Sequence, residues 1–110
     1  MHEIHSKLLW LGHAQDARQP KPLFDVGIEA VVDLAYEEAP AQLPRQLIYC
    51  RIPLVDGSGN DIRLITNAVN CLVGLLQSNV PTLVACSAGV SRSPSVAAYA
   101  LGRYLSLIHI

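Results

Sequence analysis

The sequence has no excess of charge of either sign. Eight basic residues stand against nine acidic ones, which gives a formal net charge of −1. Proteins that bind nucleic acids or anionic membranes without specificity carry a broad basic surface, so we expect no nucleic-acid partner. An anionic substrate would have to be held by a local arrangement of groups.

Long apolar runs are also missing. No stretch approaches the roughly 20 apolar residues that a membrane-spanning helix needs. The later apolar segments are interrupted by Asn67, Asn70, Gln77, Pro81 and Arg92. Residues 1–12 lack the apolar region and the small-residue cleavage site of a signal peptide. We therefore expect a cytoplasmic protein with no membrane partner.

Cysteine is scarce and odd in number. Cys50, Cys71 and Cys86 contain no C-x-x-C pair, so the pattern predicts neither a disulfide framework nor a zinc site. We interpret Cys50 and Cys71 as small buried hydrophobic residues. The four histidines show no metal-ligand spacing, and we expect no metal or other cofactor.

What the sequence does contain is an alternation of strand-like and helix-like segments. Its 110 residues suffice for one core, and we expect a single domain over residues 1–110 of the α/β class. The patterns predict strands at 7–11, 30–34, 47–54 and 82–85, a short helix ending at Gly27, a long helix to about Gln77, and a helix from Ser93.

The chemistry is concentrated in residues 86–93, Cys-Ser-Ala-Gly-Val-Ser-Arg-Ser, between a predicted strand and a predicted helix. In such a loop the backbone N–H groups of residues 87–92 can turn inward around an anion, and the positive end of the helix adds to the same field. That field also favours the thiolate of Cys86, which is the reactive form of cysteine. The pattern predicts one site that binds a dianion and activates a nucleophile.

Several side chains in this loop suit phosphoryl transfer. The planar fork of Arg92 can hold two phosphoryl oxygens, and Ser93 can donate a hydrogen bond to the sulfur when it leaves. Gly89 lets the backbone approach the phosphate without a Cβ. The predicted substrate-binding residues are Ser87, Ala88, Gly89, Val90, Ser91 and Arg92.

Breaking a phosphate ester also requires a proton for the departing oxygen. Asp56, in the glycine-rich loop 54–59, is the candidate general acid. The same carboxylate could later accept a proton from the water that hydrolyses a phosphocysteine. Asp61 is the reserve candidate, although Asn60 or Asp61 is placed first of all to cap the long helix.

These segments resemble the dual-specificity phosphatase branch of the protein tyrosine phosphatase superfamily. Residues 86–93 resemble its H-C-x-x-G-x-x-R-S signature, and residues 52–56 are similar to its general-acid segment. Residues 10–12 and 27–28 are also similar, and the resemblance runs from about residue 8 to 105. It implies a tyrosine phosphatase-like fold with a central, mostly parallel sheet flanked by helices.

For catalysis, the resemblance implies Cys86 as nucleophile, Arg92 as phosphate ligand, Ser93 as helper to the leaving thiolate and Asp56 as general acid. It also implies metal-free hydrolysis through a phosphocysteine. Because the loop adds no lysine for further phosphates, we expect phosphotyrosine and phosphoserine or phosphothreonine in protein as substrates, and a monomeric enzyme.

Two departures from the family pattern leave alternatives open. Ala85 stands where the family has a histidine before the nucleophile, and the chain ends at Ile110, before the last helices of the family. We therefore expect an incomplete domain and a slower enzyme, with a phosphate-binding pseudophosphatase as the alternative. A rhodanese-type or arsenate-reductase-type cysteine-loop enzyme is the less favoured alternative. Sulfur transfer needs neither Ser93 nor Asp56, and arsenate reduction would need a resolving cysteine, Cys50 or Cys71, near Cys86.

Overall fold

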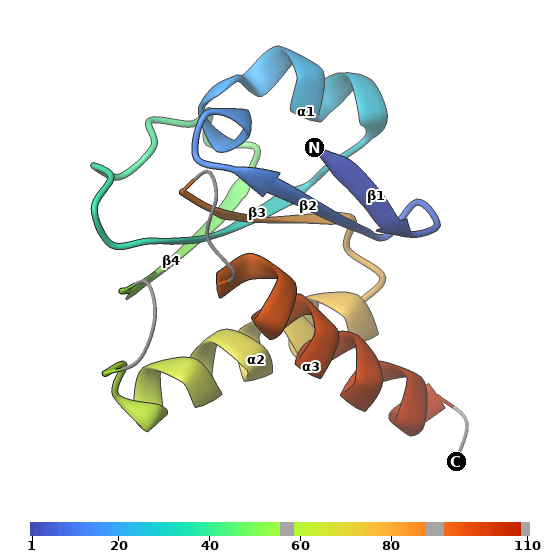
Figure 1. The fold of residues 1–110 in the computed structure, drawn as a ribbon. Coiled ribbons are helices and arrows are strands. Elements are labelled where there is room, and N and C mark those ends of the chain that lie inside the picture. Colours follow the sequence, from blue (N-terminus) through green and yellow to red (C-terminus); the bar gives the residue numbers. More distant parts are fainter. Residues whose placement is uncertain (56–58, 88–91, 109–110) are drawn as a thin grey trace.

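The computed structural model describes residues 1–55, 59–87 and 92–108. In this part of the chain a five-stranded sheet separates α1 on one face from α2 and α3 on the other (Figure 1). In chain order the elements are β1 (His2–His5), β2 (Leu9–His13), a 3-10 turn (Asp16–Arg18), α1 (Pro20–Val26), β3 (Ala30–Ala35), β4 (Ile48–Leu54), α2 (Ile62–Gln77), β5 (Thr82–Cys86) and α3 (Arg92–Ile108). The predicted α/β class is confirmed.

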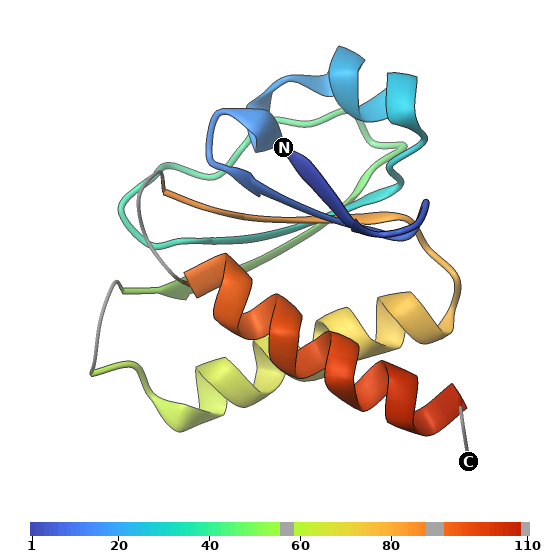
Figure 2. The ribbon, with the colours of Figure 1, turned by 45° about the vertical axis from the view of Figure 1, so that its right-hand side comes forward.

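The sheet order β1-β2-β5-β3-β4 places β5 at the centre. Its neighbours β2 and β3 run parallel to it, β4 runs parallel to β3, and only β1 is antiparallel. Central parallel strands are covered on both faces, which is why β5 reads as a continuous apolar run. Because the four parallel strands end at the same edge, the carboxyl ends of β3, β4 and β5 lie together there (Figure 2).

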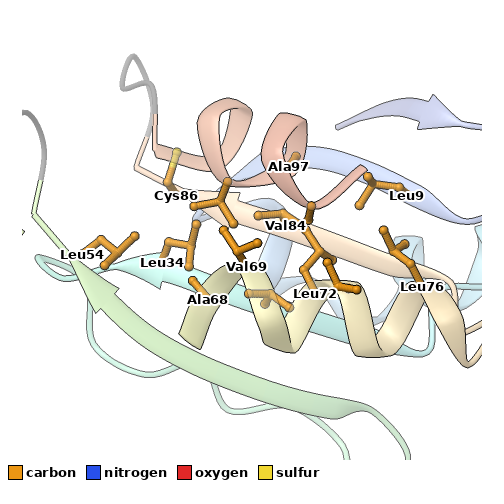
Figure 3. Packing of buried hydrophobic residues seen from close by; sticks show 14 of the residues in the cluster. Leu9, Leu34, Leu54, Ala68, Val69, Leu72, Leu76, Val84, Cys86 and Ala97 are labelled. Carbon is orange, nitrogen blue, oxygen red and sulfur yellow. The ribbon is translucent and has the colours of Figure 1, made fainter. Parts of the chain in front are cut away.

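Alternate residues of β5 face two separate clusters of buried side chains. Leu83 and Ala85 pack with Trp10 and Leu23 on the side of α1. Val84 and Cys86 pack on the other side with residues of α2 and α3, among them Leu72 and Ala97 (Figure 3). The direction of the Cys86 side chain is therefore fixed by strand alternation.

The long helix α2 begins where the sequence predicted. Asp61 is the N-cap, and its carboxylate accepts a hydrogen bond of 2.8 Å from the backbone N–H of Arg63. The apolar positions at helical spacing from Ile62 to Leu76 predict a helix face that packs on the core, but this is wrong for Ile62, whose side chain is 70% exposed. Burial begins further along the helix, at Ala68, where the sheet and α3 cover it.

The N-terminal hairpin was not predicted. The sequence pattern indicated one strand at 7–11, whereas the structure has β1, a turn in which Lys7 adopts a φ of 57°, and β2 beginning at Leu9. A hydrogen bond of 2.8 Å from the Lys7 N–H to the Glu3 carboxylate closes the turn. Because β1 is short and mostly exposed, it carries no apolar periodicity from which to predict a strand.

Within the described segments, every helix is too short or too polar to cross a bilayer.

A buried carboxylate anchors the loop between β3 and β4, residues 36–47. Asp33 is fully buried and accepts hydrogen bonds from the Tyr49 hydroxyl at 2.6 Å and the Ala35 N–H at 3.1 Å. Burial and the Asp33 carboxylate raise the pKa of Tyr49, so the phenol stays protonated and remains a donor at neutral pH. The same hydroxyl accepts a hydrogen bond from the Ala41 N–H at 2.8 Å, which ties the loop to the sheet.

We expect Tyr49→Phe to lower the free energy of unfolding by about 1–3 kcal/mol, because it leaves a buried carboxylate with one donor fewer. Urea unfolding at neutral pH measures this. Tyr99→Phe is the matched control, since Tyr99 is an exposed residue of α3 and surface changes of this kind stay within about 0.5 kcal/mol. Equal stability of the two variants would contradict the anchoring role of the Tyr49 hydroxyl.

Candidate active site

Cys86 is the last residue of β5 and lies at the carboxyl edge of the sheet. Its side chain is 3% exposed, and its Sγ lies 3.0 Å from the Oγ of Ser93, within hydrogen-bond range for sulfur. Ser93 is the second residue of α3 and is itself buried. The strand end and the helix start thus bring a thiol and a hydroxyl into contact.

Arg92 opens α3 and is buried, with 5% of its surface exposed. Its Nη1 donates a hydrogen bond to the carbonyl oxygen of Leu54, and its Nη2 donates to Oε1 of Glu37 at 2.8 Å. Among the residues that the structure describes, none accepts a hydrogen bond from its buried Nε. The guanidinium is therefore anchored by the Leu54 carbonyl and the Glu37 carboxylate.

Glu37, in the loop after β3, is a member of the site that the sequence analysis missed. Its Oε1 accepts hydrogen bonds from both Arg92 Nη2 and the Ser87 hydroxyl. The bonds from Ser87 and Arg92 lower the pKa of Glu37, so it is ionised at neutral pH. The one available signal was its position just after a buried strand, which ends at the same edge as Cys86.

A cavity of about 280 Å³ opens beside Cys86 and Ser93. Its lining residues come from the end of β5, the start of α3 and the N-terminal segment: Cys86, Ser87, Ser93, Pro94, Met1, His2, Leu11, Gly12, His13 and Asp16. The His13 side chain is half exposed, and His13 pairs in register with Cys86 between β2 and β5. The cavity offers room for a substrate group next to the thiol.

Two parts of the predicted site, Asp56 and residues 88–91, lie outside the described residues. On either side of Asp56, Val55 and Asn60 are joined by two hydrogen bonds of 2.7 Å, one in each direction. Leu54, whose carbonyl anchors Arg92, lies two residues before Asp56 in the chain.

The described residues contain no group of three or more histidine, cysteine, aspartate or glutamate side chains arranged to hold a metal ion.

The family of the chain is shown by a family model that matches most of its length. The family model described as "Polymorphic toxin system, DSP-PTPase phosphatase" (Tc-R-P) matches residues 11–104. The chain belongs to this phosphatase family. The resemblance to dual-specificity phosphatases is thereby confirmed, whereas the link to polymorphic toxin systems was not foreseen from the sequence. None of the curated proteins matches the chain.

Solved dual-specificity phosphatases share the fold. Human DUSP28 superposes with a TM-score of 0.81 at 20% sequence identity, covering 96% of this chain and 73% of its own. A mouse protein assigned as a dual-specificity phosphatase, crystallised with zinc tungstate, gives 0.78 at 21% identity, covering 93% and 64%. OH1 from the Orf virus, described as a tyrosine phosphatase with triple substrate specificity, gives 0.69 at 27% identity, covering 92% and 59%.

Proposed function

We propose that this chain hydrolyses phosphate monoesters on proteins through a phosphocysteine at Cys86. The observation that carries the proposal is the gathering of three groups at the carboxyl edge of the sheet. The Ser93 hydroxyl lies 3.0 Å from the Cys86 thiol, and the buried Arg92 guanidinium bonds Leu54 at the end of β4 and Glu37 after β3. They occur in a chain whose family is one of phosphatases. The expected substrates are phosphotyrosine and phosphoserine or phosphothreonine in protein.

In the first step the Cys86 thiolate attacks phosphorus and the ester P–O bond breaks. Asp56 gives its proton to the departing oxygen, so that the dephosphorylated hydroxyl leaves neutral. Arg92 holds the oxygens of the phosphoryl group as their charge redistributes. The product of this step is the phosphocysteine, with Asp56 now a carboxylate.

In the second step water attacks the phosphocysteine and the P–S bond breaks. The Asp56 carboxylate accepts a proton from the attacking water, and inorganic phosphate is released. Ser93, whose Oγ lies within hydrogen-bond range of the sulfur, stabilises the thiolate that forms. The cycle then returns to a thiolate at Cys86 and a protonated Asp56.

A pseudophosphatase that binds phosphate without turnover is the second candidate. It is favoured by Ala85, which replaces the histidine of the family signature, and by the ion pair that Arg92 already makes with Glu37. An arsenate reductase is disfavoured. It would need a second reactive thiol near Cys86, whereas β3 separates the strand of Cys50 from β5. Burial and the contact with Cys50 raise the pKa of Cys71 to about 12.

The test is hydrolysis of aryl phosphates by the whole chain in the presence of a metal chelator, after circular dichroism has shown a folded sample. We expect turnover, and acid quenching during turnover should trap one phosphoryl group on the peptide that contains Cys86. Asp56→Asn should reduce kcat by about 100-fold for an aryl phosphate whose phenol is a poor leaving group. The loss should be smaller for a nitrophenol, which leaves without a proton.

Asp61→Asn is the matched control for Asp56→Asn. Asp61 caps α2 and its amide replacement can still accept from the Arg63 N–H, so kcat should stay within about threefold of wild type. A folded wild-type chain that binds phosphate without hydrolysing any aryl phosphate would identify the pseudophosphatase instead.

A further inference from the structure

One carboxylate oxygen joins the two residues that flank the segment 88–91. Oε1 of Glu37 accepts from the hydroxyl of Ser87, directly after Cys86, and from Nη2 of Arg92 at 2.8 Å. These contacts reach across 50 and 55 residues of sequence. Nothing in the proposed mechanism uses Glu37, yet it contacts both ends of the phosphate loop.

The backbone around Glu37 is fixed before any ligand binds. Nη2 of Arg51 donates hydrogen bonds to three carbonyl oxygens on either side of it, at 2.9 Å to Glu38 and at 3.4 Å to both Ala35 and Tyr36. Arg18 donates to the carbonyl of Ala39, a little further along the same loop. The loop that carries Glu37 is thus held in place by Arg51 and Arg18, and it positions the Glu37 carboxylate next to Arg92.

The charge of Glu37 has two opposite consequences for a phosphate at Arg92. A buried guanidinium needs a counter-ion, and Glu37 supplies one in the absence of substrate. A bound phosphate dianion would share the same guanidinium and would be repelled by the carboxylate. Because the Glu37 side chain is 46% exposed, solvent weakens this repulsion without removing it.

We propose that Glu37 is a positioning residue of the phosphate site that also competes with phosphate for Arg92. It holds Ser87 and Arg92 in place for the transition state, and its negative charge weakens the binding of inorganic phosphate, so that the product leaves more readily. The proposal rests on the proposed function, because it requires that phosphate binds at Arg92.

Two variants of Glu37 separate the effect of its negative charge from the effect of its hydrogen bonds with Ser87 and Arg92. Glu37→Gln keeps an oxygen that can accept from Ser87 and Arg92 but removes the charge. We expect it to bind inorganic phosphate about five- to tenfold more tightly in isothermal titration calorimetry. Glu37→Ala removes both contacts, and we expect kcat to fall by about tenfold or more while circular dichroism still shows a folded chain.

Glu38→Gln is the matched control, because this neighbouring glutamate, which is partly buried, contributes its backbone carbonyl and not its side chain to the Arg51 contact. Its phosphate affinity and kcat should equal those of wild type. The proposal is overturned if Glu37→Gln binds phosphate no more tightly than Glu38→Gln, or if Glu37→Ala keeps the wild-type kcat.

The phosphate titration also separates this inference from the proposed function. A wild-type chain that binds phosphate but hydrolyses no ester would end the proposed function, and the comparison of Glu37→Gln with Glu38→Gln would still decide the role of the carboxylate. If neither wild type nor Glu37→Gln binds phosphate, the inference fails together with the site.

Discussion

Cys86→Ser should reduce kcat for an aryl phosphate by about 10⁴-fold or more. The serine hydroxyl stays protonated at neutral pH, so the variant lacks the anionic nucleophile that the first step requires. The fold should survive, because serine is close to cysteine in size and the site at the end of β5 is already lined by the Ser93 hydroxyl. Steady-state kinetics with a chelator present measure the loss of kcat. Calorimetric titration of inorganic phosphate measures whether the variant still binds phosphate.

The phosphate titration is what makes the result specific to the nucleophile. Arg92 is anchored by the Leu54 carbonyl and the Glu37 carboxylate, and Cys86→Ser changes neither group, so phosphate affinity should stay within about threefold of wild type. Loss of phosphate binding alongside activity would mean that Cys86→Ser damages the loop, and the variant would then not identify a nucleophile.

Cys71→Ser provides the matched thiol control. Burial and the contact with Cys50 raise the pKa of Cys71 to about 12, so this thiol stays protonated and is a poor nucleophile at neutral pH. Its replacement should change kcat by no more than about twofold. A large loss of activity in Cys71→Ser, or substantial activity in Cys86→Ser, would contradict the assignment of Cys86 as the nucleophile.

The core of the site could be predicted from the sequence because it is local. Cys86 ends a short apolar run, Arg92 and Ser93 begin the helix that follows, and the structure has β5 ending at Cys86 and α3 starting at Arg92. Strand alternation and helix initiation fix where these side chains point, and both depend on neighbouring residues. The contact between Cys86 and Ser93 spans only seven residues.

Glu37 could not be predicted in the same way, because its contacts depend on the order of strands in the sheet. Placing β3 beside β5 brings the loop after Ala35 to the residues that follow Cys86. Periodicity along the chain predicts that both strands exist, but it does not say which strands are neighbours. The carbonyl of Leu54, at the end of β4, reaches Arg92 for the same reason.

The sequence pattern also does not predict which of Asn60 and Asp61 caps α2. Either residue could cap a helix that begins at Ile62, and both side chains suit the role equally well. In the structure Asp61 is the cap, and Asn60 instead exchanges two hydrogen bonds with the backbone of Val55. The choice depends on the return of the chain to the end of β4, which no pattern within the helix encodes.

Arg92→Lys should reduce kcat/KM by about 10³-fold while keeping the positive charge. Arginine reaches Leu54 and Glu37 with its two terminal nitrogens. The single ammonium of lysine cannot make both of these contacts in the same planar geometry. Because its charge is not held in a planar fork, it stabilises the redistributed charge of the transition state less well than a bidentate guanidinium.

Arg103→Lys is the control for a change of the same chemistry on the same helix. Arg103 lies in α3 and bonds the Asn70 side chain of α2 at 2.6 Å in an exposed contact, so kcat/KM should be unchanged within about twofold. If Arg92→Lys retained nearly full activity, a point charge would be sufficient at this position. Catalysis would then depend on the charge of residue 92, and the planar geometry by which Leu54 and Glu37 hold the guanidinium would be unnecessary.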